Sequence, residues 1–404
     1  MNTISKRVIP FSPPDFGETE IEAVIKTLRS GWITTGPRTK EFENKIAARV
    51  GVEKAVCLSS ATSAMELVLR ILGVGPGDEV ITSAYTFTAS ASVITHVGAK
   101  VVLVDTSKDS YEMDYNLLSE AITEKTKVII PVDFAGVICD YDKIYEIINK
   151  KKSKFMPSND IQKGFGRVIV MADSAHAFGA KRDSFNCGQL ADFSCFSFHA
   201  VKNLTTAEGG AVVWRHHNHI NHEWLYNQFM LYSLHGQSKD ALAKNQLGSW
   251  EYDIVFPAYK CNMTDIMASL GIAQLKRYDQ LIERRHRIIS MYNQGFKDLG
   301  VTTLSHTGDG FTSSGHLYPI RIDNYSENDR NNVIVRLGEM GVASNVHFKP
   351  LPLLTAYKNL GFSIESYPNA YDMYKNEVTL PLHTLLSDED VMYVIECLRK
   401  AILK

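Results

Sequence analysis

Three groups of side chains in this sequence have the types and spacing to act on one reaction. Thr62 and Ser63 stand in "SSATSAM", between an apolar run and a helical pattern. Asp173 closes the apolar run "RVIVMAD", and Lys202 lies between "FSCFSF" and Glu-Gly-Gly. Hydroxyls at a helix start suit a phosphate, and a carboxylate behind so apolar a run needs a cationic partner. Taken singly, each group has a structural explanation: helix caps at Thr62 and Asp173, and a solvent-directed Lys202.

The order of the three groups favours chemistry over those explanations. A phosphate cradle, a buried acid and a lysine are what pyridoxal 5′-phosphate requires, because its aldehyde forms a Schiff base with a lysine and its ring nitrogen pairs with a carboxylate. An ion pair at about 3 Å, in an effective dielectric of about 20, is worth roughly 5 kcal/mol before desolvation. That is enough to keep the ring nitrogen protonated at neutral pH. Phe87, in "SAYTFTASAS", offers a ring to stack on the cofactor.

The elements that position these groups are short strands alternating with helices. The strands are continuous Val- and Ile-rich runs, typical of a sheet with helices on both faces. The alternation predicts an α/β domain with a mostly parallel sheet, in which ligands bind at the carboxyl ends of the strands. The predicted strands lie within 54–60, 79–83, 100–106, 127–133, 167–173 and 193–198, with helices within 62–73, 116–122 and 140–149.

The second part of the chain differs in pattern. A long helical pattern, N-capped by Thr264, runs over 264–296 and is expected to bridge two domains. Shorter strands and helices beyond Gly300 predict a smaller α+β unit. We therefore predict a large α/β cofactor-binding domain over 1–263, including the N-terminal segment, and a bridging helix with a small C-terminal domain over 264–404. The Lys-rich stretch 150–166 is expected to be a solvated surface insertion.

Composition and charge exclude several classes of function. The 404 residues carry a formal net charge of −2, so no basic surplus indicates nucleic acid. No run of about 18 apolar residues indicates a membrane span, and the start has no signal-peptide pattern. The six cysteines are scattered without a C-x-x-C pair, which predicts reduced core residues, a cytoplasmic protein and no metal site. No G-x-G-x-x-G opens the first strand unit, which argues against a nicotinamide oxidoreductase, and nothing provides the DNA-binding appendage of a regulator.

The motifs resemble those of the DegT/StrS-type nucleotide-sugar aminotransferases, which depend on pyridoxal phosphate and have the type I aminotransferase fold. The resemblance extends from "FSPPDFGETEIEAV" to "TLPLHTLLSDEDV", nearly the whole chain. It rests on "SGWITTGP", "SSATSAM", "GDEVIT", "ADSAHAFGA", "SFHAVKNLTTAEGG" and "YKCNMTDIMASLGIAQL". The chain most resembles the branch that aminates UDP-linked 4-ketosugars, such as the enzyme making UDP-4-amino-4-deoxy-L-arabinose.

The resemblance implies a role for each matching residue. Lys202 would be the Schiff-base lysine and general acid/base, and Asp173 the partner of the ring nitrogen. Thr62, Ser63 and Ser197 would hold the phosphate.

Other matching positions concern the ring and the subunit interface. Asn262 would reach the phosphate from a neighbouring subunit, which implies a homodimer with shared active sites. His176 would lie by the phenolic oxygen of the cofactor. Phe87 stands where the arabinose enzyme has tryptophan, so a stacking ring is retained while the sugar stays open. Ala207 stands where many relatives carry glycine.

The reaction implied is a ping-pong transfer from L-glutamate, released as 2-oxoglutarate, to a nucleotide-linked ketosugar. Some relatives have histidine at the lysine position and dehydrate sugars, so Lys202 favours amination over dehydration. A dTDP-linked 3-ketosugar aminotransferase remains an alternative. The residues favour packed structural roles for His199, His347 and His383 over substrate contact.

Overall fold

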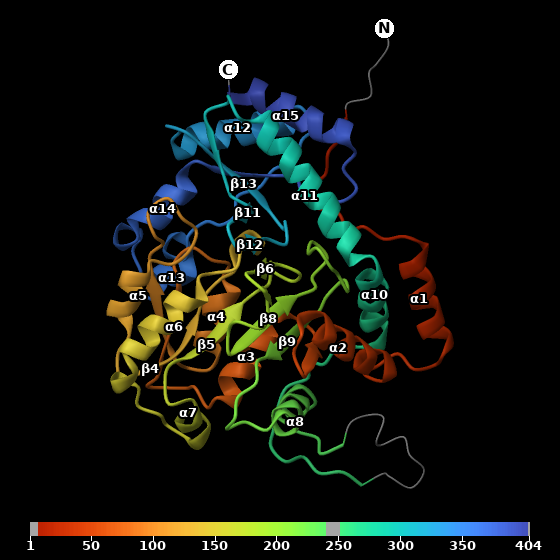
Figure 1. The fold of residues 1–404 in the computed structure, drawn as a ribbon, viewed down its shortest axis with the longest axis vertical. Helices are drawn as coiled ribbons and strands as arrows, with labels where there is room; N and C mark the ends of the chain where they lie inside the picture. Colours follow the sequence, from red (N-terminus) through yellow and green to blue (C-terminus); the bar gives the residue numbers. More distant parts are fainter. Residues whose placement is uncertain (1–6, 240–250, 403–404) are drawn as a thin grey trace.

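A seven-stranded sheet forms the centre of the computed structural model, which describes residues 7–239 and 251–402. In sheet order its strands are β1 (Ala55–Leu58), β9 (Gly210–Trp214), β8 (Phe193–Ser197), β5 (Ile169–Asp173), β4 (Thr126–Ile130), β2 (Glu79–Ser83) and β3 (Lys100–Val104). All pairings from β8 to β3 are parallel, and β9 runs antiparallel to both β8 and β1. The predicted mostly parallel sheet is confirmed. In Figure 1 this sheet lies below the C-terminal helices.

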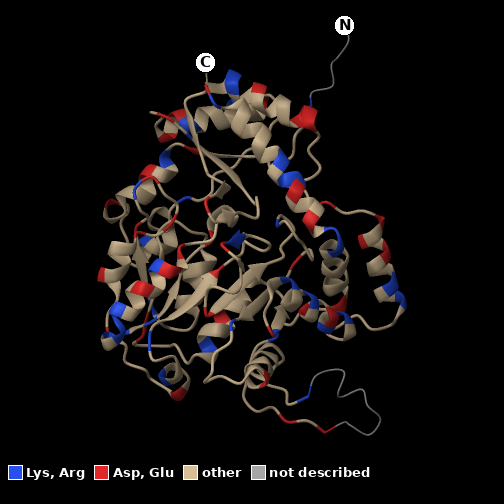
Figure 2. Ribbon diagram, in the orientation of Figure 1, with Lys and Arg blue, Asp and Glu red and all other residues tan. Residues whose placement is uncertain are grey.

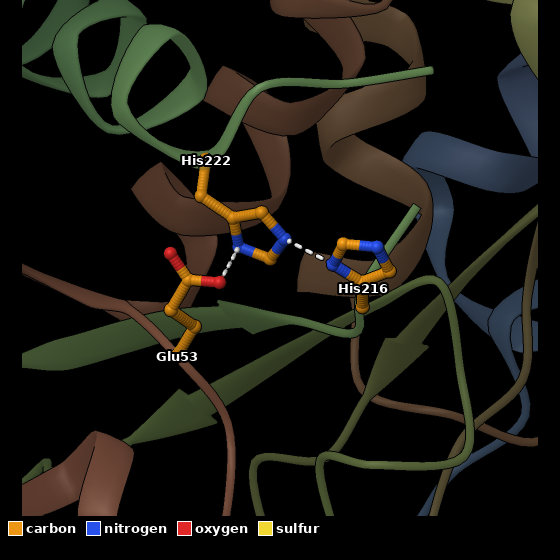
Figure 3. Close-up of side chains that lie close together, drawn as sticks. All are labelled: Glu53, His216 and His222. Atoms are coloured by element: carbon orange, nitrogen blue, oxygen red, sulfur yellow. Dashed lines mark hydrogen bonds and ion pairs between the residues drawn. The ribbon is translucent and has the colours of Figure 1, made fainter. Parts of the chain in front are cut away.

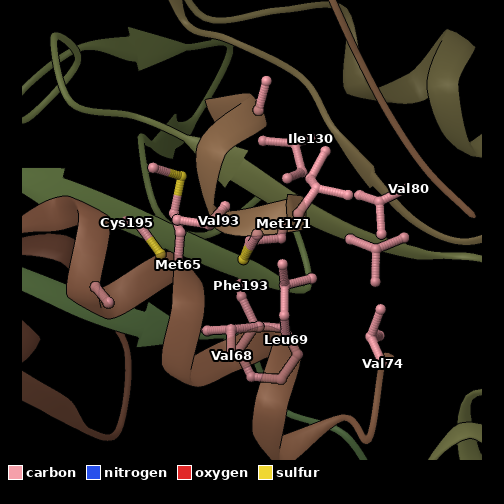
Figure 4. Packing of buried hydrophobic residues seen from close by; sticks show 14 of the residues in the cluster. Met65, Val68, Leu69, Val74, Val80, Val93, Ile130, Met171, Phe193 and Cys195 are labelled. Atoms are coloured by element: carbon pink, nitrogen blue, oxygen red, sulfur yellow. The ribbon is translucent and has the colours of Figure 1, made fainter. Parts of the chain in front are cut away.

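Helices bury both faces of the sheet. Along β5, Ile169 and Met171 join one apolar cluster while Val170 and Ala172 join another, because successive side chains of a strand point to opposite faces. Figure 4 shows the first cluster, in which the apolar side of α3 packs against the strands. The helices around the sheet are α2 (Pro37–Val50), α3 (Ala61–Ile71), α4 (Ala89–His96), α5 (Tyr115–Ala121), α6 (Tyr141–Lys150), α7 (Asp160–Phe165) and α8 (His222–Ser233).

The first residue of β9 lets α3 begin directly against the sheet. A Cβ on Gly210 would lie 2.3 Å from the carbonyl carbon of Ser60 and 2.4 Å from the amide nitrogen of Ala61. Ser60 caps α3: its hydroxyl accepts from the Ser63 amide at 3.0 Å, and the Ser63 hydroxyl accepts from the Ser60 amide at 3.2 Å. The second glycine of Glu-Gly-Gly therefore makes room for a helix N-terminus at the carboxyl edge of the sheet.

A carboxylate from a distant helix caps α2. Gly36 has no side chain to cap this helix, and the buried Asp265 accepts from the amides of Gly36 at 2.8 Å and Thr39 at 2.9 Å. Asp265 opens α10 (Asp265–Lys276), whose N-cap is Thr264, as predicted. This contact joins the motif "SGWITTGP" to "NMTD" and fixes the segment that carries Asn262.

The prediction of one long helix over 264–296 is wrong. The segment forms two helices, α10 and α11 (Tyr278–Gly295). They are separated at Arg277, where the backbone leaves helical geometry (φ −112°, ψ 11°). The Arg277 guanidinium pairs with Glu20 at 2.8 Å and Asp15 at 3.1 Å, so the break is tied to the N-terminal segment. Helix α10 packs on α2 and on α1 (Glu18–Arg29), whereas α11 packs on α15 (Asp388–Ile402).

The C-terminal region has its own sheet and core. Antiparallel strands β10 (Val301–Thr303), β13 (Tyr318–Ile322) and β14 (Glu377–Leu380) pack with α11, α12 (Glu327–Glu339) and α15. Ile9 pairs with Val342 and joins this core, so part of the N-terminal segment lies with the C-terminal region. The domain boundary at residue 264 stays a prediction. Smaller elements are β6 (Lys181–Arg182), β7 (Phe185–Asn186), β11 (Thr307–Gly308), β12 (Phe311–Thr312), α13 (Thr355–Asn359) and α14 (Pro368–Lys375).

The stretch 150–166 is more than a solvated insertion. It contains α7, in which Gln162 and Phe165 are buried, and the Gln162 amide donates to the Leu72 carbonyl at 2.9 Å. The stretch thus satisfies a carbonyl at the C-terminal end of α3.

Figure 2 shows Lys and Arg interspersed with Asp and Glu along the helices. Across residues 7–239 and 251–402, no helix has the length and apolar character to cross a membrane.

Candidate active site

A cavity of 420 Å³ lies at the carboxyl edge of the central sheet. Asp173, the last residue of β5, and Lys202, five residues after β8, both line it. Strands β5 and β8 are parallel neighbours, with Asp173 beside Cys195 in register. The sheet therefore brings together an acid and a lysine that lie 29 positions apart in the sequence.

Asp173 is a buried carboxyl with few partners. It is 5% exposed, its Oδ2 accepts from the Ser90 hydroxyl at 2.6 Å, and its Oδ1 accepts from the Ala175 amide at 3.2 Å. Burial raises the pKa of Asp173, whereas the Ser90 hydroxyl, the Ala175 amide and the charge of Lys202 lower it. A cationic group placed in the cavity would stabilise the ionised form further.

Lys202 has an amine with a lowered pKa. Burial lowers the pKa of Lys202 from 10.5 to about 8, and the nearby Asp173 carboxylate opposes that shift. A substantial fraction of neutral amine is therefore present at pH 7 to 8. A neutral amine is the form that attacks a carbonyl or accepts a proton.

His176 is held as a neutral imidazole. The Ala135 amide donates to its Nδ1 at 3.2 Å, which places the ring proton on Nε2. Burial, with the charges of Lys202 and His347, holds the pKa of His176 well below its usual value. Its ring lies against Phe348, with the centroids 5.9 Å apart and the planes at 25°. His176 thus presents an N–H donor beside a lysine at this cavity.

The residues predicted to hold a phosphate separate into two groups. Thr62 and Ser197 line the cavity, close to the N-terminus of α3. Ser63 does not line it, because its hydroxyl is engaged in the capping box with Ser60. The explanation of Thr62 as the helix cap is wrong, since Ser60 is the cap. The Thr62 hydroxyl is therefore available to a ligand in the cavity.

Asn262 lies outside the cavity lining of its own chain. Its amide nitrogen donates to the Thr35 hydroxyl and, at 3.3 Å, to the Met263 carbonyl, while its Oδ1 accepts from Lys260. It is half-buried beside β1, where it pairs with Leu58. The structure of one chain therefore does not bring Asn262 to Lys202.

Phe87 lines the cavity with a largely free ring. It is 57% exposed, and the nearest aromatic ring, that of Phe348, lies 5.9 Å away between centroids. A planar ligand can cover such a ring, so the stacking role of Phe87 stays a prediction.

Two further residues of this site, Ser90 and His316, were not predicted from the sequence, and a third, His347, was expected to be structural. Ser90 supports Asp173 from α4, as described above. His316 and His347 line the cavity, with their Nδ1 atoms 2.9 Å from Asn203 Oδ1 and 3.0 Å from Thr379 Oγ1. Burial lowers the pKa of His347 to about 4 and that of His316 well below its usual value. No spacing signal pointed to them, because they come from two separate loops of the C-terminal region.

The three histidines expected to be structural have different surroundings. His383 is 3% exposed and its Nε2 lies 3.1 Å from the Pro10 carbonyl, so the structural prediction holds. His347 is a cavity residue instead. His199 is not packed in the core: its side chain is 47% exposed at the cavity rim, 3.6 Å from Glu208.

The donors around the cavity match the parts of pyridoxal phosphate. A helix N-terminus with the Thr62 and Ser197 hydroxyls suits the phosphate, and the Asp173 carboxylate suits the ring nitrogen. Lys202 offers a neutral amine for the aldehyde, and Phe87 a free face for the ring. The residues present therefore fit this cofactor.

Comparison with known proteins identifies the family. The profile of the DegT/DnrJ/EryC1/StrS aminotransferase family matches residues 14–399. The chain belongs to this family. It is similar to the spore coat polysaccharide biosynthesis protein SpsC of Bacillus subtilis, with 36% identity over 97% of the chain and 96% of the relative. It is also 34% identical, over 99% of both chains, to the UDP-4-amino-4-deoxy-L-arabinose–oxoglutarate aminotransferase of Shewanella sediminis.

Solved structures agree with this membership. A protein of Streptococcus pneumoniae, described as a candidate sugar aminotransferase, is 57% identical in its pyridoxamine phosphate form, with a TM-score of 0.96 over 98% of this chain and 99% of that one. Its pyridoxal phosphate form gives 55% identity and a TM-score of 0.95. The chain is thus a sugar aminotransferase that uses pyridoxal phosphate. The predicted family, fold class and cofactor are confirmed.

Proposed function

We propose that this aminotransferase transfers the amino group of L-glutamate to the C4 keto carbon of a UDP-linked ketosugar, for a surface polysaccharide or glycan. The observation that carries amination is the presence of Lys202 and Asp173 in one cavity, since a reacting lysine and an acid for the ring nitrogen are what an amino transfer through pyridoxal phosphate needs. The names of the Shewanella and Bacillus relatives support the sugar class.

Three residues of the cavity have proposed tasks at the cofactor ring. Pyridoxal phosphate, when bound, supplies a carrier for the amino group and a ring that withdraws electrons from the reacting carbon. Asp173 holds a proton on the ring nitrogen, because its buried carboxylate is poorly solvated and favours a cationic partner. Lys202 moves the proton to and from the reacting carbon as a neutral amine. His176 would donate from Nε2 to the phenolic oxygen, because its Nδ1 already accepts from the Ala135 amide.

The phosphate and the second subunit complete the proposal. Thr62 and Ser197, with the first turn of α3, bind the phosphate. Ser63 supports them by holding that turn in its capping box. Asn262 reaches the phosphate in the partner subunit of a homodimer, which accounts for its distance from the cavity of its own chain.

The test is an assay of 2-oxoglutarate release from L-glutamate with a panel of UDP- and dTDP-linked 3- and 4-ketosugars. A UDP-linked 4-ketosugar is expected to give the highest kcat/KM. A dTDP-linked 3-ketosugar with a higher kcat/KM would establish the alternative position of amination. Consumption of sugar without 2-oxoglutarate release would establish dehydration instead.

A further inference from the structure

A histidine-rich turn lies at the edge of the central sheet opposite the active site. The segment "HHNHINHE", residues 216–223, joins the end of β9 to the start of α8 and contains four histidines. One of them, His222, lies between His216 and Glu53, which comes from the turn between α2 and β1 (Figure 3). None of the three lines the cavity of Lys202.

The three side chains bring donor atoms together at short range. His216 Nδ1 lies 3.1 Å from His222 Nε2, and Glu53 Oε2 lies 3.6 Å from His222 Nδ1. One donor atom of each residue lies within 4.8 Å of those of the other two. His222 is 7% exposed, while Glu53 and His216 are exposed, so an ion could enter from solvent.

Each imidazole also has an oxygen acceptor for its second nitrogen. His216 Nε2 lies 3.1 Å from Asn218 Oδ1, and His222 Nδ1 faces the Glu53 carboxylate. Metal-binding histidines almost always give their second N–H to a carboxylate, carbonyl or water. Two nitrogens bound at 2.0–2.1 Å to one tetrahedral ion lie about 3.3 Å apart, close to the separation of His216 Nδ1 and His222 Nε2.

We propose that His216 and His222 bind one divalent transition-metal ion, with Zn²⁺ the best match, through Nδ1 and Nε2 respectively. Imidazole nitrogen suits Zn²⁺. Glu53 accepts the Nδ1 proton of His222 and balances the charge of the ion, and water fills the remaining positions. The ion would fasten the α2–β1 turn, the end of β9 and the start of α8 to one another. The scattered cysteines predicted no metal site, and this one rests on histidines instead.

The buried indole of Trp214 supplies a built-in reporter. Its Nε1 donates to His222 Nδ1 at 3.2 Å, so metal-free His222 carries its proton on Nε2 and donates it to His216. Metal binding at Nε2 shifts that proton to Nδ1, where Glu53 accepts it and Trp214 loses its acceptor. Ion binding must therefore change the environment of a tryptophan that is 1% exposed.

The experiment titrates chelator-treated, cofactor-loaded protein with Zn²⁺, followed by calorimetry and tryptophan fluorescence. We expect one ion per chain with a Kd below about 100 µM, a fluorescence change with the same midpoint, and a higher Tm. His216→Ala and His222→Ala should each weaken binding more than tenfold, and Glu53→Gln about tenfold. His216 is exposed, so its variant tests the site even if His222→Ala fails to fold.

His219→Ala is the matched control. His219 belongs to the same turn, but its ring lies against Phe165, 4.6 Å between centroids. Its variant should keep the Zn²⁺ affinity. If His219→Ala and His216→Ala lost Zn²⁺ affinity equally, the binding would be a general property of the histidine-rich segment. That result would overturn the proposed site. Absence of one-to-one binding in the wild-type protein, or binding without a fluorescence change, would also overturn it.

Discussion

The Ser90 hydroxyl, on α4, donates at 2.6 Å to Oδ2 of Asp173, at the end of β5. The Thr86 hydroxyl lies 2.8 Å from Ser90 Oγ, so that Thr86, Ser90 and Asp173 form a chain of hydrogen bonds. Burial raises the pKa of the Asp173 carboxyl, and the hydrogen bond from Ser90 opposes that rise. The ionised state of Asp173 therefore depends on a serine outside the cavity lining.

Ser90→Ala should reduce kcat about tenfold, because a hydrogen bond to a charged group is worth about 1.5 kcal/mol or more. Loss of the donor raises the pKa of Asp173, and the ionised form is the active one, so the acid limb of the pH–rate profile should move to higher pH. The measurement is kcat and kcat/KM against pH. Ser92→Ala is the control, because Ser92 binds Thr88 on the same helix. Equal profiles for the two variants would contradict this role of Ser90.

Lys202 should react as an amine with a pKa of about 8 in cofactor-free protein. Labelling with a low concentration of an amine-reactive reagent, read by mass spectrometry of peptides, should show the modification of Lys202 rising through pH 8. Asp173→Asn should move this midpoint to lower pH, because the carboxylate favours the charged amine. A midpoint that is unchanged in Asp173→Asn would show that the two groups do not interact. Peptides with solvent-exposed lysines serve as the internal reference.

Local patterns predicted the large sheet and the part of the site that follows its strands. Asp173 and Lys202 each come after a buried apolar run, and parallel neighbours bring such positions to one edge of a sheet. His316 and His347 could not be found this way, because the C-terminal region brings them to the cavity through tertiary packing. The break at Arg277 escaped for a similar reason: an apolar helical pattern continues through it, and the contacts with Asp15 and Glu20 are distant in sequence.

Ala207→Gly should raise stability. Ala207 is exposed and has φ +70°, a left-handed conformation that costs an L-residue about 1 kcal/mol and glycine little. We expect the free energy of unfolding to rise by about 0.5–1 kcal/mol, measured as a higher Tm. Ala356→Gly, in the exposed face of α13, should lower it. A lower Tm for Ala207→Gly would contradict the strain argument.

The proposed shared site predicts complementation between two inactive proteins. Lys202→Ala removes the reacting amine, and Asn262→Ala removes a phosphate donor that would act in the partner subunit. In a mixed dimer one site then carries both lesions and the other neither, because a two-fold interface exchanges the contributions of the two chains. Random exchange of equal amounts makes half of the dimers mixed, each with one intact site, so about a quarter of the wild-type activity should return.

The measurement needs Asn262→Ala to be inactive alone and subunit exchange to be demonstrated, for example with two differently tagged chains. Thr264→Ala is a useful companion, since Thr264 caps α10 next to Asn262 without a proposed contact to the cofactor. Mixing Thr264→Ala protein with Lys202→Ala protein shows how much of the change in activity comes from a disturbed α10. Persistent inactivity of the Lys202→Ala and Asn262→Ala mixture, despite proven exchange, would place Asn262 in the site of its own chain. The position of Asn262 outside the cavity favours the opposite result.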